Sequence, residues 1–256
     1  MAQTQLIEAS DLGQNLQAAQ TSAVGTLGLN SRSNLGVYLL NSNVQYEGPA
    51  PATRIERTAL VAIGTYAASA RLNLDAALPY WAQYDTTIFT TSSRPRLGSL
   101  WLRARYAILP EANGFALLAR GGLETSDSAS NNPSVFAELQ PLWRVGNGSV
   151  ASVTLGLAQA QQTLGRQYLA GSWAFAATPA LVISPSLRFT RYADANGFSA
   201  YTSTGFGLST VYALSNNWQL VGALGSTRYS APTFFGFAGP QAAQQVDLSV
   251  GVVRVF

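Results

Sequence analysis

The C-terminal end of the chain alternates between apolar and polar residues and stops on an aromatic residue. In an extended strand neighbouring side chains point to opposite faces, so this alternation gives the strand one apolar and one polar face. The pattern recurs along nearly the whole chain, yet no apolar run approaches the roughly 18–20 residues that a membrane-spanning helix needs. Strands of this kind are typical of a barrel surrounded by lipid. The apolar face of the last strand consists of Val246, Leu248, Val250, Val252 and Phe256, and the polar face of Gln245, Asp247, Ser249 and Gly251.

The composition favours the same fold class. Charged residues make up 11% of the chain, against about a quarter in soluble domains. A β-sandwich or a propeller is the soluble alternative, but the persistent alternation favours a transmembrane antiparallel β-barrel of the bacterial outer membrane, with lipid as a partner. All 15 basic residues are arginines, and they are spread over many strands with a net charge of +3. Nucleic acid is not an expected partner, because its phosphates require a dense basic surface.

Alternation between turn residues predicts twelve strands, each about long enough to cross a bilayer at a tilt. Every second link is short and rich in Gly, Pro, Asn and Ser, whereas several of the others are longer. Short turns on one side and longer loops on the other place both termini of the chain in the periplasm. The predicted strands cover residues 34–46, 54–67, 70–83, 96–108, 114–125, 134–145, 150–160, 166–177, 180–192, 199–213, 217–230 and 244–256.

Aromatic residues near the predicted strand ends fit the interfacial girdles of such a barrel. Ordinary aromatic residues on the surface of a soluble sheet are the alternative interpretation. The girdle candidates are Tyr80, Trp143, Trp173, Tyr212 and Trp218.

The charged residues on the predicted inner faces are the candidate pore lining. Two interpretations stay open: a slightly basic lumen that favours anionic or polar solutes, or ladders of arginine and carboxylate groups that brace the wall. The candidates are Arg71, Asp75, Arg103, Arg105, Arg120, Glu124, Glu138, Arg144, Arg188 and Asp247.

Residues 1–30 do not alternate, so we expect an N-terminal segment followed by a barrel at residues 31–256. Ser10 is a candidate cap for a short amphipathic helix. Such a helix beside a polar lumen indicates a plug, and a disordered leader or the end of a longer periplasmic region is the alternative. The first residues show neither the charged nor the apolar region of a secretory signal, and we expect that signal to have been removed or not to be included in this sequence. The plug candidates are Asp11, Leu12, Leu16, Gln17 and Ala19.

The absence of certain residue types argues against an enzyme. The chain contains no His and no Cys, and it has no Lys. Without these residues a serine nucleophile lacks its usual base, and a metal lacks its commonest nitrogen and sulfur ligands. We therefore expect no catalytic residues, no metal and no cofactor.

Two features resemble known outer-membrane barrels. The segment Ala70-Arg71-Leu72-Asn73-Leu74-Asp75-Ala76-Ala77-Leu78-Pro79-Tyr80 is similar to the early strand ending in Leu-Pro-Tyr of the phenol meta-pathway barrels. Twelve strands after a short helix resemble the FapF family of channels, which secrete functional-amyloid subunits in biofilm formation. This resemblance implies a homotrimer, a periplasmic coiled-coil region, a helix around residues 10–20 that gates the pore, and export of unfolded polypeptide.

Three functions compete at this point. The first is a gated channel that exports unfolded polypeptide. The second is a diffusion channel, or porin, for small hydrophobic or aromatic compounds. The third is the translocator barrel of an autotransporter, whose N-terminal helix crosses the pore.

Overall fold

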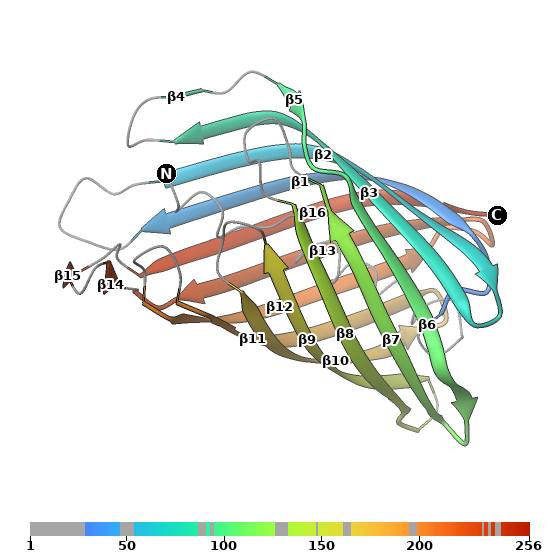
Figure 1. Ribbon diagram of the computed structural model, residues 1–256. Coiled ribbons are helices and arrows are strands. Elements are labelled where there is room, and N and C mark those ends of the chain that lie inside the picture. The colour runs from blue at the N-terminus through green and yellow to red at the C-terminus, as the bar shows by residue number, and fades with distance from the viewer. Residues whose placement is uncertain are drawn as a thin grey trace.

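The first long strand pairs with the last and closes the sheet into a barrel (Figure 1). The computed structural model describes residues 29–46, 54–86, 91–92, 95–125, 133–146, 148–160, 165–194, 199–231, 233–234, 237–238 and 242–256. Within them no helix is long and apolar enough to cross a membrane. The twelve long strands are β1 (Asn34–Tyr46), β2 (Arg54–Ser69), β3 (Leu72–Thr86), β6 (Trp101–Ala112), β7 (Phe115–Glu124), β8 (Ser134–Arg144), β9 (Ser149–Ala160), β10 (Arg166–Thr178), β11 (Leu181–Tyr192), β12 (Tyr201–Ala213), β13 (Trp218–Tyr229) and β16 (Ala243–Val255).

Neighbouring strands are antiparallel, and each pairs with the next long strand along the chain, which confirms the predicted fold class. Burial alternates residue by residue along β1 and β16. On β16 the side chains of Val246, Leu248, Val250 and Val252 are exposed on the outside, while Asp247 and Ser249 are buried on the inside. In an apolar solvent this inside-out arrangement is the stable one, because the outer side chains remain solvated by lipid tails.

Aromatic side chains gather on the outer surface at the end of the barrel that carries the short turns. This position matches an interfacial girdle on the periplasmic side. The outward Arg254 lies among them, with its guanidinium 5.7 Å from the ring centre of Trp218 and 5.2 Å from that of Phe256. The exposed aromatic residues at this end are Tyr66, Tyr106, Trp143, Trp173, Tyr212, Trp218 and Phe256.

Two predicted boundaries were wrong in an informative way. The strand expected at 96–108 runs from Trp101 to Ala112, and its turn is the pair Asn113 and Gly114, both at positive φ (52° and 75°). An Asn-Gly pair suits the tight turn of a hairpin, and irregular pairing just before it accommodates Pro110. The β2–β3 turn lies at residues 70–71, since β2 continues to Ser69.

The wall is least continuous between β3 and β6. β3 pairs with β2 as far as Thr86, but it pairs with β6 only from Leu72 to Ala77. Beyond that point Pro79 offers no N–H, and its carbonyl accepts a hydrogen bond from the amide of Gly98 at 2.8 Å. Figure 1 shows β3 and β6 diverging toward the end of the barrel away from the C-terminus. The gap is bridged by the short strand β5 (Arg96–Leu97), which pairs with Tyr80 and Trp81 of β3.

Three other two-residue strands lie in the longer connections at the same end of the barrel. β4 (Thr91–Ser92) pairs with the end of β3, and β14 (Thr233–Phe234) pairs with β15 (Phe237–Ala238) between β13 and β16. Alternation over four or more residues is needed to recognise a strand in a sequence, so these were not predicted.

Candidate functional site

A belt of polar side chains runs around the inner wall at one level. The register places Arg105 of β6 opposite Arg120 of β7, and Arg120 opposite Glu138 of β8. Glu138 lies opposite Gly156 of β9, which lies opposite Tyr168 of β10. Each of these residues occupies an inward position because its two chain neighbours face lipid. Alternation thus assembles one polar belt from five strands.

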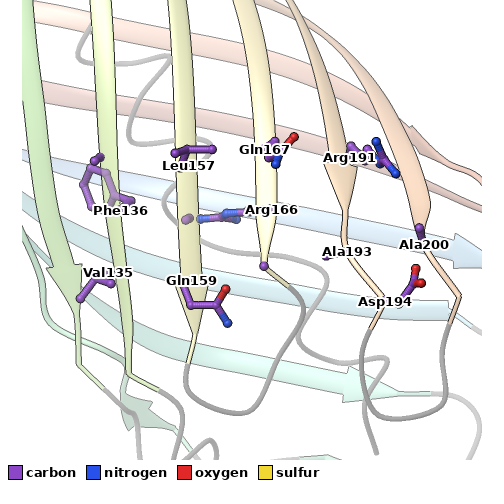
Figure 2. Close-up of a pocket in the computed structure, with 13 residues that line it drawn as sticks. Val135, Phe136, Leu157, Gln159, Arg166, Gln167, Arg191, Ala193, Asp194 and Ala200 are labelled. Atoms are coloured by element: carbon purple, nitrogen blue, oxygen red, sulfur yellow. The ribbon is translucent and has the colours of Figure 1, made fainter.

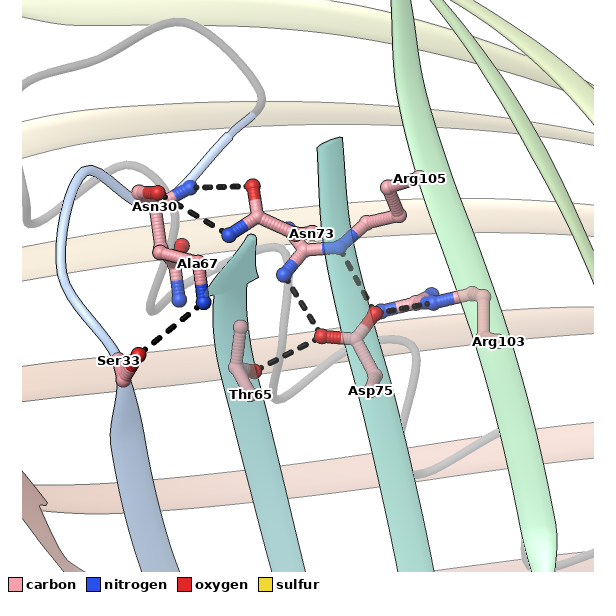
Figure 3. A network of polar contacts seen from close by, with 8 residues as sticks. All are labelled: Asn30, Ser33, Thr65, Ala67, Asn73, Asp75, Arg103 and Arg105. Atoms are coloured by element: carbon pink, nitrogen blue, oxygen red, sulfur yellow. Dashed lines mark hydrogen bonds and ion pairs between the residues drawn. The ribbon is translucent and has the colours of Figure 1, made fainter. Parts of the chain in front are cut away.

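The most densely bonded part of the belt surrounds Asp75 of β3 (Figure 3). Arg105 donates from Nε to Oδ2 and from Nη2 to Oδ1, each at 2.8 Å. Arg103 donates from Nε to Oδ2 at 2.9 Å, and Thr65 donates from Oγ1 to Oδ1 at 2.8 Å. These charge-assisted bonds fill both carboxylate oxygens and tie β2, β3 and β6 together.

A second ion pair lies further around the belt. Nε of Arg120 is 2.6 Å from Oε2 of Glu138, and Nη2 of Arg120 donates to Thr154 at 3.1 Å. The hydroxyl of Tyr168 donates to Oε1 of Glu138. The guanidinium of Arg188 lies 4.3 Å from the ring centre of Tyr168. Arginine, carboxylate and tyrosine thus brace β7 to β11, as the ladder interpretation expects.

Arg103 keeps donors that the belt does not use. Its side chain is fully buried (0% exposed), and Nη1 and Nη2 have no hydrogen-bond partner among the described residues. The same holds for Nε1 of the buried Trp101. The guanidinium of Arg103 lies 4.9 Å from the ring centre of Trp101, and Trp101 stacks on Phe136 with ring centres 5.8 Å apart.

The predicted pore-lining residues fall into two groups. The inner face of the described strands carries Asp75, Arg103, Arg105, Arg120, Glu124, Glu138, Arg188 and Asp247. Two others do not reach the belt: Arg71 lies exposed in the β2–β3 turn, and Arg144 forms an exposed pair with Glu111 at the periplasmic end (2.7 Å).

Sequence reasoning missed several inward residues. Arg57, Trp101, Arg166 and Tyr168 are all buried on the inner face. The signal was present, because Trp101 and Arg103 are two residues apart on one strand and must share a face.

The opposite part of the inner wall contains an apolar cluster. This buried cluster on β1, β2, β12, β13 and β16 includes Tyr38, Val61, Val221 and Val253. The ring of Tyr38 lies against the wall at Gly251, where a Cβ would be 2.2 Å from the ring. The same strands also bury Arg57 and Asp247, so this part of the wall is mixed.

The chain that precedes β1 turns into the lumen. Ser33 lies at the periplasmic rim, where its Oγ accepts a hydrogen bond from the amide of Ala67 at 3.1 Å. Asn30 is buried and exchanges two hydrogen bonds with the inward Asn73, at 3.2 and 3.0 Å. Leu29 packs against inward side chains of β6, β7 and β8, namely Ala107, Ala116, Leu118 and Leu142. The predicted plug candidates, Asp11, Leu12, Leu16, Gln17 and Ala19, lie outside the described residues.

Two adjoining cavities of about 720 and 680 Å³ lie along β8 to β11, and the first, shown in Figure 2, extends to Ala200 just before β12. They share Ala137, Leu157, Gln167 and Arg191, which belong to the outer face of their strands. Their linings also include inward residues, namely Phe136 and Arg166 in the first cavity and Glu138 and Tyr168 in the second.

No family model matches the chain, and no curated protein matches it. The chain does match solved structures of outer-membrane proteins. The COG4313 outer membrane channel from Pseudomonas putida F1 is 16% identical over 90% of this chain and 97% of that chain, with a TM-score of 0.64. The translocator domain of the autotransporter NalP from Neisseria meningitidis is 11% identical over 100% and 98% of the two chains, with a TM-score of 0.58. The KdgM porin in complex with disordered oligogalacturonate is 11% identical over 86% and 99%, with a TM-score of 0.56.

At these identities the likeness shows the fold. In its described residues the chain is a closed antiparallel β-barrel of twelve long strands, the fold of these outer-membrane proteins. None of these three proteins is a channel for amyloid subunits by its description, so the predicted FapF resemblance, with its homotrimer and its role in biofilm formation, stays a prediction.

Proposed function

We propose that the protein is a gated diffusion channel of the outer membrane that favours small anionic solutes. The observation that carries the proposal is the charge of the inner wall. Among the described residues, the buried charged side chains are five arginines (Arg57, Arg103, Arg105, Arg120, Arg166) and three acids (Asp75, Glu138, Asp247). A surplus of guanidinium groups in an enclosed, low-dielectric wall raises the local concentration of anions.

The proposed gate is the segment that precedes β1. Leu29 and Asn30 lie inside the barrel and are anchored to its inner wall at β3, β6, β7 and β8. One apolar contact cluster and two hydrogen bonds attach the segment to the wall. Each hydrogen bond contributes about 0.5–1.5 kcal/mol, so the free energy of attachment is about a few kcal/mol. Such a tether is weak enough to be released.

The gate is tested by conductance of the full chain in planar bilayers. Leu29→Asp places a carboxylate in an apolar contact and expels the segment. Ser31→Asp is the matched control, because Ser31 is exposed at the rim. We expect Leu29→Asp, and a chain without residues 1–28, to raise the open probability at least tenfold, and Ser31→Asp to behave as the wild type. An unchanged open probability in both altered chains would contradict the gate.

A second function is favoured by the short paired stretch between β3 and β6, which we call the seam. Leu78, Tyr80 and Leu97 are exposed there, where β3 no longer pairs with β6 and only the two-residue strand β5 pairs with it. This arrangement supports passage of small hydrophobic compounds through the wall. A disulfide between cysteines introduced on either side of the seam would block hydrophobic uptake and leave anion conductance intact.

Export of unfolded polypeptide, including amyloid subunits, has no support from the residues of the described inner wall. It remains testable in cells that carry the chain together with an unfolded periplasmic substrate. Appearance of that substrate outside the cell, dependent on the Leu29–Asn30 tether, would replace the present proposal.

A further inference from the structure

The carboxylate of Asp75 cannot take up more of the arginine donors around it. Oδ1 receives Thr65 and Arg105, and Oδ2 receives Arg103 and Arg105. Each oxygen therefore has two donors, so Nη1 and Nη2 of Arg103 have no place on this carboxylate. Buried donors of this kind are costly, and a native structure that keeps them calls for an explanation.

Arg103 shares its carboxylate with a second arginine. Arg105 and Arg103 both bond to Asp75, while Arg120 is paired with Glu138 at 2.6 Å. Glu124, the other acid of this region, lies opposite Trp101 in the register and accepts a hydrogen bond from Ser134 at 3.5 Å. A carboxylate that accepted hydrogen bonds from Nη1 and Nη2 of Arg103 would remove the cost of burying these donors without a partner.

A flat apolar surface borders these donors. Trp101 and Phe136 are stacked with an interplanar angle of 8°. The ring of Phe136 lies over Gly122, and Gly122 is opposite Arg103 in the register. Nε1 of Trp101 adds a third donor without a described partner beside the two of Arg103.

We propose that Arg103 and Trp101 form a site for the carboxylate of a small organic acid with a flat apolar body. The Nη1 and Nη2 groups of Arg103 hold the two carboxylate oxygens as a fork, and Nε1 of Trp101 donates to one of them. The apolar body lies against the Trp101–Phe136 pair. This inference rests on the proposed function and names its class of solute.

The site is enclosed. The Arg103 side chain is fully buried, so a solute reaches it only after neighbouring side chains move. Asn73, which lies opposite Arg105 and two residues from Asp75, is held by its hydrogen bonds to Asn30.

Equilibrium dialysis of the full chain in detergent with radiolabelled benzoate tests the site. We expect one saturable site per chain, with benzyl alcohol and chloride competing at least tenfold more weakly. Arg103→Gln abolishes the site and Arg103→Lys, which keeps the charge but not the fork, weakens it about tenfold. Arg71→Gln is the matched control, because Arg71 lies in the exposed turn, and it leaves binding unchanged.

A separate control verifies that the variants fold. Asp75 keeps Arg105 and Thr65 in the Arg103→Gln variant, and the shift of the folded barrel in unheated gel electrophoresis verifies the fold. Equal binding of benzoate and benzyl alcohol would overturn the inference. Wild-type binding of benzoate by the Arg103→Gln variant would overturn it as well, because water would then be the only partner of these donors. Anion conductance without benzoate binding would overturn only the inference, whereas benzoate binding without any conductance would overturn only the proposed function.

Discussion

Arg105 holds both oxygens of Asp75 through Nε and Nη2, each bond being 2.8 Å long. The two side chains are 3% and 0% exposed. They join β3 to β6 within the short paired stretch from Leu72 to Ala77. The bidentate pair therefore fastens the barrel where its backbone ladder is shortest.

We expect Asp75→Asn to lower the free energy of unfolding by about 3–5 kcal/mol, because it removes the charge that two buried guanidinium groups share. Equilibrium unfolding in urea, followed by tryptophan fluorescence in lipid vesicles, measures the change. Glu111→Gln is the matched control, since its pair with Arg144 is about one-third exposed (38% and 32%), and such pairs contribute about 0–1 kcal/mol. Equal changes in the two variants would show that the Asp75 network is not a structural fastening.

Gly156 gives a second prediction, about the inner wall. A Cβ at Gly156 would be 2.0 Å from Cζ of Tyr168. Gly156→Ala therefore displaces Tyr168 and its hydrogen bond to Glu138, and we expect a loss of about 1–3 kcal/mol. Gly171→Ala, whose Cβ would be 3.9 Å from the nearest atom, should change stability by less than about 0.5 kcal/mol. Thermal unfolding in detergent compares them, and a harmless Gly156→Ala would contradict the packing described here.

The outer surface gives a third prediction. Leu248 is 56% exposed near the middle of β16. We expect Leu248→Arg to destabilise the barrel in vesicles by about 2–4 kcal/mol, whereas Gln244→Arg, on the same face near the end of the strand, costs about 0–1 kcal/mol. Unfolding titrations in vesicles measure both. Identical costs at the two depths would mean that lipid does not surround this face.

The alternation was sufficient to predict the barrel and most of its strands. The first strand was predicted at 34–46 and observed at Asn34–Tyr46, because its two flanks lose the period-two pattern. The strand expected at 96–108 begins later, at Trp101, since Arg96 and Leu97 belong to the separate short strand β5. A two-residue strand leaves no periodicity to distinguish it from its neighbour.

The inward direction of Asp75, Arg103 and Arg105 was also predictable, but their mutual contact was not. That contact depends on the register of β3 against β6, which is set by pairing Asn73 with Arg105. The long connection between these strands does not fix a register in the way that a two-residue turn does. The unused donors of Arg103 follow only from the finished geometry.

Reversal potential in planar bilayers is the most direct test of the central claim, that the arginine surplus of the inner wall makes an anion-favouring pore. The full chain and its Leu29→Asp variant are compared across a tenfold KCl gradient, with Arg103→Gln introduced into each. The account predicts a chloride-to-potassium permeability ratio above 1 that falls toward 1 with Arg103→Gln. A ratio below 1, or no current even in the Leu29→Asp variant, would contradict it.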